Sequence, residues 1–243
     1  MIKGRLSYPR RAWSKLPSWW AQDSGIGERV QGGERRAGAS IALIRLMLWL
    51  ASLTPRNDSY AVECSMGALA EAMKVSLPPL RAAIKRAVSL GMIRFERGNG
   101  RQRSKFVLVC PKHEANEPGG FCAIPNQRMQ NCLRRLPMKG TTSLAAHKIY
   151  VALLVHRGNP NREVTLNYIN LRRYTGVQQD DVRDALNLLA THGLVVINRE
   201  PSFGDHHSAN VYRLRGQLPR PVEPDDESDD PDDGTIDFKM LLD

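Results

Sequence analysis

The side chains with the most evident chemistry in this chain are cations concentrated between residues 81 and 105. Arginine and lysine bind phosphate groups and the acceptor atoms on the edges of nucleic-acid bases. They form two groups, three cations within six residues and then five more: Arg81, Lys85 and Arg86, then Arg94, Arg97, Arg101, Arg103 and Lys105. This density of positive charge predicts a surface for a polyanionic partner.

No catalytic set of residues stands out, so we expect a binding protein and not an enzyme. The sequence contains neither a G-x-x-x-x-G-K-[ST] phosphate loop nor an H-E-x-x-H zinc helix. The cysteines lack the paired spacing of common zinc sites and are expected to be reduced thiols without metal: Cys64, Cys110, Cys122 and Cys132. No cofactor is predicted.

The periodicity of the sequence places the cations on two consecutive elements. Leu80, Ile84 and Val88 recur every four residues, which predicts a helix with one apolar stripe. Gly91 ends that helix. Residues 93–97 and 101–107 alternate in polarity around Gly98-Asn99-Gly100, which predicts a β-hairpin. A cationic helix is therefore followed directly by a cationic hairpin.

Three elements are expected before the cationic helix: an almost continuously apolar helix at 41–53, a short strand at 60–62 and a second helix at 66–74. With the hairpin, this order resembles the winged helix-turn-helix family of DNA-binding domains. The resemblance implies that the cationic helix enters the major groove and that the hairpin contacts the backbone or the minor groove. The turn departs from the family, because Ser76-Leu77-Pro78 replaces its usual glycine.

An internal repeat indicates two copies of this fold. A constant offset of 102 residues superimposes apolar positions and a glycine without a gap: Val62 on Val164, Leu69 on Leu171, Val75 on Val177, Leu80 on Val182, Ala83 on Ala185, Ile84 on Leu186, Gly91 on Gly193, and Met92-Ile93 on Leu194-Val195. The second copy is expected to have helices at 144–155, 168–174 and 180–192. Its strands are expected at 163–166, 195–199 and 210–214.

The third helix of the second copy has a different surface. The predicted DNA contacts of the second copy are Gln178, Gln179, Arg183 and Asn187 at this helix and Arg199 on the following strand. Glutamine and asparagine can bond to adenine. Asp180, Asp181 and Asp184 are unfavourable near phosphates. Two interpretations stay open for this helix, contact with DNA and contact with a protein, including a second copy of the chain.

Charge divides the chain into a basic body and an acidic tail. Residues 1–217 carry 33 lysines and arginines against 15 acids, a net charge of +18, whereas residues 218–243 have −8. We expect the tail to be disordered and either to solubilise the protein or to bind a partner protein. The partner-binding residues are then the apolar ones at its end: Ile236, Phe238, Met240, Leu241 and Leu242.

The N-terminal residues combine arginines with Trp13, Trp19 and Trp20. One interpretation is a flexible arm whose indoles stack on or wedge into nucleic acid. The other is that the tryptophans dock on the first domain. No signal peptide is evident, and residues 41–53 are too short to span a bilayer, so we expect a cytoplasmic, nucleoid-associated protein without membrane contact.

The predicted fold is α+β, mainly α, with two tandem winged helix-turn-helix domains. The expected divisions are an arm at 1–37, the main DNA reader at 38–110, a connector at 111–140, a second domain at 141–216 and the tail at 217–243. The connector is expected to contain a short helix at about 127–136. The predicted function is sequence-specific binding of double-stranded DNA as a transcriptional regulator. The alternatives are a plasmid or phage replication initiator that recruits replication proteins through its tail, and a protein-binding scaffold. A homodimer is left open.

Overall fold

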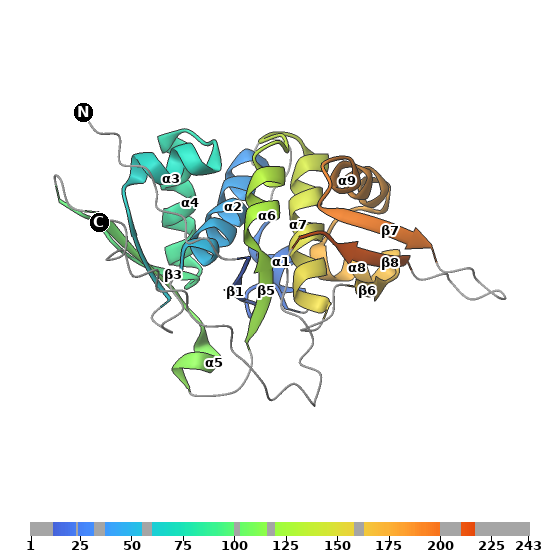
Figure 1. Cartoon of the computed structure of the whole chain (residues 1–243), viewed down its shortest axis with the longest axis horizontal. Coiled ribbons are helices and arrows are strands. Elements are labelled where there is room, and N and C mark those ends of the chain that lie inside the picture. The colour runs from blue at the N-terminus through green and yellow to red at the C-terminus, as the bar shows by residue number, and fades with distance from the viewer. Residues whose placement is uncertain are drawn as a thin grey trace, which may run out of the picture.

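The structure is a computed structural model that describes residues 12–22, 24–31, 37–54, 60–99, 103–115, 120–157, 163–199 and 210–216. The fold is α+β and mostly helical, with three small antiparallel sheets among the described residues. Among those residues, every helix is too short or too polar to cross a membrane. Figure 1 shows the elements spread along one long axis, with residues 66–114 at the left, the first two elements near the centre and residues 163–214 at the right.

The first of two similar units, called the first unit below, surrounds a long apolar helix. It consists of α2 (Ala37–Leu53), β2 (Ala61–Cys64), α3 (Met66–Met73), α4 (Leu77–Ser89), β3 (Ile93–Glu96) and β4 (Ser104–Leu108). The strands pair in the order β2-β4-β3. From Ser40 to Leu53 every residue of α2 is buried, in agreement with the prediction of a central core helix.

The second unit repeats this order of elements. It consists of α7 (Thr141–His156), β6 (Glu163–Leu166), α8 (Tyr168–Thr175), α9 (Gln179–Thr191), β7 (Val195–Arg199) and β8 (Asn210–Leu214), with strand order β6-β8-β7. Both ends of α8 lie 102 residues after those of α3, and both ends of α9 lie 102 residues after those of α4. The predicted internal repeat is therefore confirmed for these elements.

The two units also use the same signals around their short helices. The side chain of Ser65 accepts from the Ala68 amide, and that of Asn167, its counterpart, accepts from the Asn170 amide. Such bonds satisfy amides that a helix start leaves unpaired. At the other end, Lys74 has φ +53° where its counterpart Gly176 has +63°.

These angles correct the sequence interpretation of the turn. The left-handed residue of the first unit is Lys74, not one of Ser76-Leu77-Pro78. The turn has the same left-handed geometry in both units, but the first unit forms it with a residue that carries a Cβ atom. Left-handed backbone is unfavourable for such a residue.

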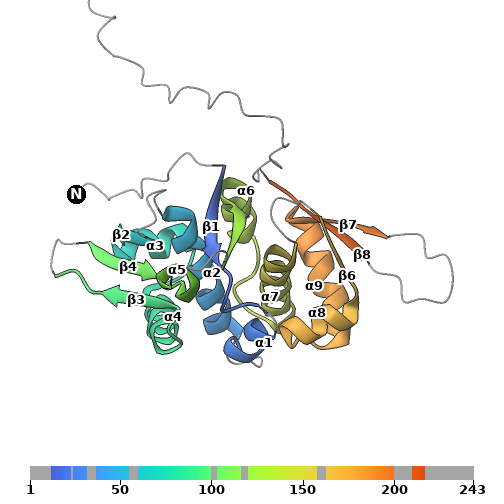
Figure 2. The same ribbon diagram turned by 90° about the horizontal axis from the view of Figure 1, so that it is seen from below.

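The N-terminal segment joins the two units. Strand β1 (Trp13–Pro17) pairs antiparallel with β5 (Phe121–Pro125), and α1 (Gly25–Arg29) packs against α8 of the second unit. Trp20 is fully buried, and the indole Nε1 of Trp19 donates to the Val109 carbonyl over 2.8 Å. The docking interpretation of the tryptophans is therefore the one that the structure supports. Figure 2 shows α1 beside α8.

The predicted connector also differs from the structure. Besides α5 (Pro111–Glu114), residues 111–140 contain β5 and α6 (Asn126–Leu133), which overlaps the short helix expected there. Cys122, Ile124, Met129 and Leu133 belong to the shared core. The segment is thus largely an ordered part of the body, because its apolar side chains are buried between the units.

The long helices α2 and α7 meet at the centre of the molecule (Figure 1). There the buried Arg45 donates through Nε to His147 Nε2 over 3.1 Å. Arg45 belongs to α2 and His147 to α7, so this bond joins the first helix of one unit to the first helix of the other.

Candidate nucleic-acid interface

A groove between α4 and the β3–β4 hairpin brings together three of the predicted cations. Arg81 and Lys85 come from consecutive turns of α4, and Arg97 follows β3. All three side chains are exposed. The groove has a volume of about 380 Å³, and its remaining lining is apolar: Met66, Ile84, Val88 and Phe95. We call it the α4 groove.

The core of the first unit holds this groove in place. Leu80, Ala83, Ile84 and Ala87 are buried, which turns the opposite face of α4, with Arg81 and Lys85, to solvent. On the hairpin, the rings of Phe95 and Phe106 lie 5.0 Å apart and join β3 to β4. The alternation of β3 places Arg97 on the same side as Phe95.

Arg86 does not belong to the groove and corrects the sequence prediction. Its guanidinium donates to the Arg29 carbonyl over 2.8 Å and to Ser40 Oγ over 3.2 Å. The side chain is half-buried and ties α4 to the N-terminal segment. Spacing along the helix could not reveal this contact, because its partners lie 46 and 57 residues earlier in the chain.

The hairpin cations have different surroundings. Arg94 is paired with Glu114 of α5, and Lys105 lies opposite Glu63 on one neighbouring strand and Glu96 on the other. These acids offset much of the charge on the outer face of the sheet. Arg103 is exposed, whereas Arg101 lies outside the described residues. The cations best placed for a polyanion are thus those at the groove and Arg103.

The corresponding helix of the second unit exposes the polar surface expected from the sequence. The predicted contact residues that are exposed are Gln178, Gln179, Arg183 and Asn187. Gln179 Oε1 accepts from Arg172 over 3.1 Å, and Arg183 lies 3.7 Å from Asp184. Arg199 ends β7, and its side chain lies outside the described part of the structure. Both signs of charge alternate on this surface.

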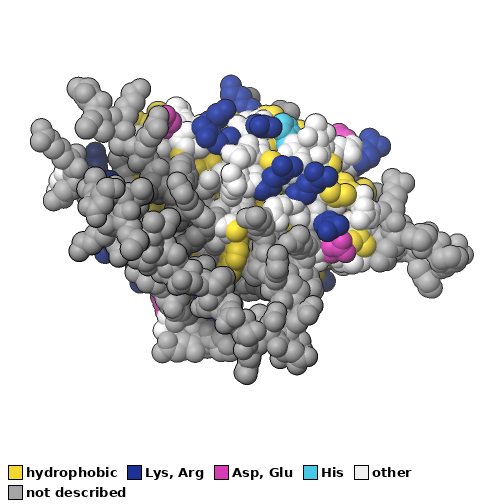
Figure 3. Space-filling view, in the orientation of Figure 1, with side chains coloured by type: hydrophobic (Ala, Val, Ile, Leu, Met, Phe, Trp, Pro, Cys, Tyr) yellow, Lys and Arg dark blue, Asp and Glu magenta, His cyan; other side chains and the backbone are white. Residues whose placement is uncertain are grey.

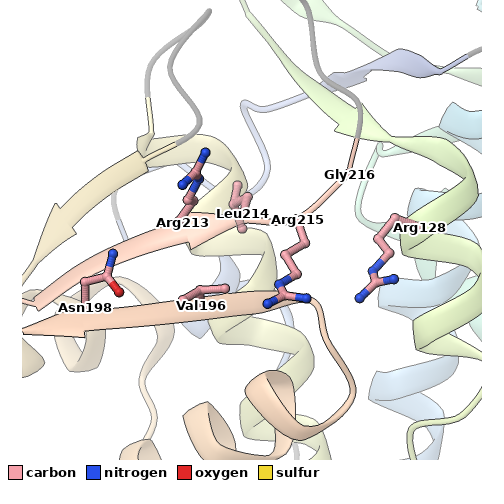
Figure 4. Close-up of a pocket in the computed structure, with 7 residues that line it drawn as sticks. All are labelled: Arg128, Val196, Asn198, Arg213, Leu214, Arg215 and Gly216. Atoms are coloured by element: carbon pink, nitrogen blue, oxygen red, sulfur yellow. The ribbon is translucent and has the colours of Figure 1, made fainter.

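A second cationic concavity, which the sequence interpretation missed, lies on the second unit. It has a volume of about 630 Å³ and is lined by Arg128, Val196, Asn198, Arg213, Leu214, Arg215 and Gly216 (Figure 4). We call it the arginine pocket. Figure 3 shows Lys and Arg side chains gathered on this face over α6 and the neighbouring sheet. The signal in the sequence that could have located this pocket was the alternation of Arg213 and Arg215 at the end of β8.

The cysteines have the properties of core thiols. All four are free and buried, and burial raises the pKa of Cys64 to about 11 and that of Cys122 to about 12. A thiol with a raised pKa remains protonated and is a poor metal ligand or nucleophile. Within the described ranges, no group of three or more His, Cys, Asp or Glu side chains is arranged to hold a metal ion.

The tail residues Ile236, Phe238, Met240, Leu241 and Leu242, predicted as partner-binding, lie outside the described residues.

Comparison with known proteins gives a likeness among solved structures and none among sequences. No protein-family description and no curated protein sequence matches the chain. This chain is similar in fold to a crystal structure of Pi initiator protein in complex with iteron DNA. The match covers 85% of this chain and 98% of that chain. The similarity has a TM-score of 0.48 and 10% sequence identity.

Proposed function

We propose that this chain is a sequence-specific, double-stranded DNA-binding protein built from two winged helix-turn-helix units. The observation that supports this most directly is the α4 groove, where Arg81 and Lys85 on a helix meet Arg97 at a hairpin. In such domains the second helix of the motif lies in the major groove and the hairpin contacts the backbone. The net charge of +18 on residues 1–217 favours a polyanionic partner.

The proposed interface divides its work between helix and hairpin. Arg81 and Lys85 are placed to bond to base edges from α4, and arginine can bond to guanine through two parallel contacts. Arg97 and Arg103 are placed to contact phosphates, which fixes position and adds affinity on every sequence. The exposed amides of α9 form the second reader, or a protein contact if the aspartates there exclude DNA.

A transcriptional regulator is the first role compatible with this interface. Both readers belong to one chain, so a single copy covers two adjacent stretches of an operator. A dimer extends the contact to a palindrome. In this role the acidic tail, which lies outside the described residues, either limits nonspecific binding or contacts another protein.

Replication initiation is the second role, and the rigid pairing of the two units favours it. Because β1–β5 and α2–α7 join the units within one chain, a single copy can occupy a site that lacks two-fold symmetry. Sites repeated head to tail then bind successive copies in one orientation. Pi initiator protein is an initiator by its name, and its structure was solved in complex with iteron DNA.

A scaffold that binds only proteins is the third role. The aspartates of α9 are compatible with it, whereas the charge of the body argues against it. The three roles predict different DNA behaviour.

Footprinting and genome-wide mapping with the full-length protein test the proposal at two salt concentrations. Salt-resistant protection of a defined sequence supports specific recognition. A single site at a promoter then favours regulation, and a repeated array at an origin favours initiation. Weak binding that disappears with salt on every sequence would contradict the proposal, because phosphate contacts alone are strongly salt-dependent.

Two substitutions test the division of work. Arg81→Ala should cost about 1–3 kcal/mol on the specific site and reduce discrimination against altered bases. Arg103→Ala should weaken specific and random DNA alike and lower the salt dependence of binding. Affinities measured by fluorescence anisotropy on matched duplexes distinguish the two effects. Equal losses on both duplexes for both variants would contradict the assignment of Arg81 to base contact.

A further inference from the structure

The arginine pocket has a geometry suited to anionic ligands. Figure 4 shows the side chains of Arg128, from α6, and Arg215, from the end of β8, extending in the same direction with their guanidinium groups side by side in this view. Arg128 Nε is bonded to the Gly193 carbonyl over 2.9 Å, and a Cβ atom added to Gly193 would clash with Arg128 Nη2. This side chain is therefore held against Gly193 at the wall of the pocket. Neighbouring cations repel each other, and an anion between them relieves that repulsion.

The charge of the pocket is only partly compensated by nearby acids. Glu163 on β6 lies opposite Arg213, and the two side chains approach to 3.9 Å. Arg215 is exposed and has no ion pair within the described part of the chain. The pocket therefore keeps positive charge available for carboxylate or phosphate oxygens, which arginine binds in pairs.

The fold itself does not require these arginines. Strand β8 follows β4 by 106 residues, so Val107 and Val109 in the first unit correspond to Arg213 and Arg215. Both pairs lie on the outer side of their sheets, since the alternate residues Phe106, Leu108, Tyr212 and Leu214 are buried. The two positions thus accept apolar side chains in the first unit. The formation of the sheet therefore does not explain why arginines occupy them in the second unit.

The acidic tail begins at the edge of this pocket. Gly216 lines the pocket, and a Cβ atom added to it would lie 2.5 Å from Pro125 Cβ and 3.0 Å from Arg128 Cβ. The Arg215 amide donates to the Leu194 carbonyl over 3.0 Å. The chain is therefore held against α6 and the sheet up to the residue from which the tail continues.

The sequence of the tail complements the pocket in charge and in length. Seven of the nine residues from Asp225 to Asp233 are acidic. Only residues 217–224 separate them from Gly216, and eight residues span at most about 30 Å. A segment tethered this closely has an effective concentration of the order of mM, so even weak ion pairs can hold it.

We propose that the arginine pocket is a carboxylate-binding site whose occupant is residues 225–233 of this same chain. Binding there neutralises the pocket and keeps the acids on the second unit, near α6, instead of over the α4 groove. The contact requires no DNA, so it can be true or false independently of the proposed function. DNA phosphate is the competing occupant.

Paramagnetic relaxation measured by NMR on the full-length chain tests the contact. Ser228→Cys provides a site for a nitroxide label, because the four native cysteines are buried. Without DNA and at about 0.05 M salt, we expect loss of amide signals around Arg128, Val196 and Arg213. Raising the salt to about 0.5 M should restore them, since screening then acts within a few ångströms.

Matched variants identify the partners. Arg215→Glu should abolish the signal loss, while Arg135→Glu, an equally exposed charge reversal just after α6, should leave it unchanged. Replacing the seven acids of residues 225–233 by Asn or Gln removes the negative partner and should also abolish the signal loss. This last variant alters only the tail, so it remains informative if Arg215→Glu fails to fold.

Three outcomes would overturn the proposal. The first is no signal loss anywhere on the second unit, and the second is signal loss that survives Arg215→Glu. The third is weaker DNA binding by Arg215→Glu together with no effect of the label on the pocket, which would assign the arginines to DNA phosphates. Failure of the protein to bind specific DNA would leave the label measurement unaffected.

Discussion

At the scale of single residues, the buried contact between Arg45 and His147 shows how the two units recognise each other. His147 Nδ1 is bonded to the Ser143 carbonyl over 2.7 Å, so that nitrogen donates and Nε2 is left to accept from Arg45. Arg45 also donates to the carbonyls of Met73 and Leu136. Burial lowers the pKa of Arg45 to about 10, so it stays charged at neutral pH.

The same contact predicts a pH dependence of stability. Burial, with a smaller effect from the charge of Arg45, lowers the pKa of His147 from 6.5 to about 3. The unfolded chain therefore binds a proton that the folded chain excludes. The contribution of neutral His147 to the free energy of unfolding is fully present above pH 6.5. It is lost as pH falls toward 3, with a limiting slope of about 1.4 kcal/mol per pH unit.

His147→Asn tests this dependence, because an asparagine oxygen can accept from Arg45 without titrating. The free energy of unfolding, measured in urea from pH 4 to 7.5, should fall less steeply below pH 6.5 in the variant than in the native chain. The carboxylates and the other histidines are the same in both proteins, so their contributions to the pH dependence cancel in the difference between the two curves. Parallel curves would show that His147 titrates normally in the folded state.

The left-handed residue at the turn gives a second prediction at this scale. Lys74→Gly should stabilise the first unit by roughly 0.5–1 kcal/mol, because glycine accepts positive φ without strain. Gly176→Ala, the reciprocal change, should destabilise the second unit by about 1 kcal/mol or more. Urea unfolding of both variants measures these effects. The same sign of change in both would contradict the shared turn geometry.

At the scale of elements, the short α1 is a structural link and not a free arm. Gly27 lies so close to the end of α8 that an added Cβ atom would be 3.0 Å from the Thr175 carbonyl carbon and from the Gly176 nitrogen. Both are backbone atoms, which cannot move aside like the end of a side chain. The close approach of α1 and α8 therefore depends on glycine.

This contact predicts opposite effects for two glycine substitutions. Gly27→Ala should destabilise the protein by roughly 1–3 kcal/mol through overpacking. Gly67→Ala, its control in α3, has open space around the added methyl group and should stabilise the helix by roughly 0.5–1 kcal/mol. Thermal unfolding ranks the variants. A neutral Gly27→Ala would mean that α1 moves away from α8 without cost.

At the scale of the whole molecule, the two units share their structural centre. The β1–β5 sheet and the α2–α7 contact each take one element from either half of the chain. Gln130 of α6 also donates to Ser52 of α2 over 2.8 Å, and Arg45 of α2 donates to His147 of α7 over 3.1 Å. Separation of the units would expose buried polar groups as well as apolar surface.

The shared centre predicts that the described body unfolds in one cooperative transition. Calorimetric and van't Hoff enthalpies should agree, and far-ultraviolet and tryptophan signals should change together. Trp20 and Trp49 are buried in the common core, so their fluorescence reports on it. Two resolved transitions would instead indicate units that fold independently and are joined loosely.

The amino-acid sequence by itself determined the repeated elements and the exposed cations of the α4 groove. Apolar residues recur at helical or alternating spacing wherever one face of an element is buried, and that local rule located both copies. The same rule predicted that Arg81 and Lys85 face solvent, because Leu80 and Ile84 on the same helix face the core. These properties depend on neighbours within a few residues.

Only the tertiary structure decided which distant residues meet. The pairing of β1 with β5, the contacts of Arg86, the bond between Arg45 and His147 and the arginine pocket all join residues far apart in sequence. No local periodicity encodes such partners, since any apolar face or cation has many compatible partners. Shape and burial in the folded chain select among them. The structure also showed that Lys74, which the sequence analysis placed in a helix, is the left-handed residue of the turn.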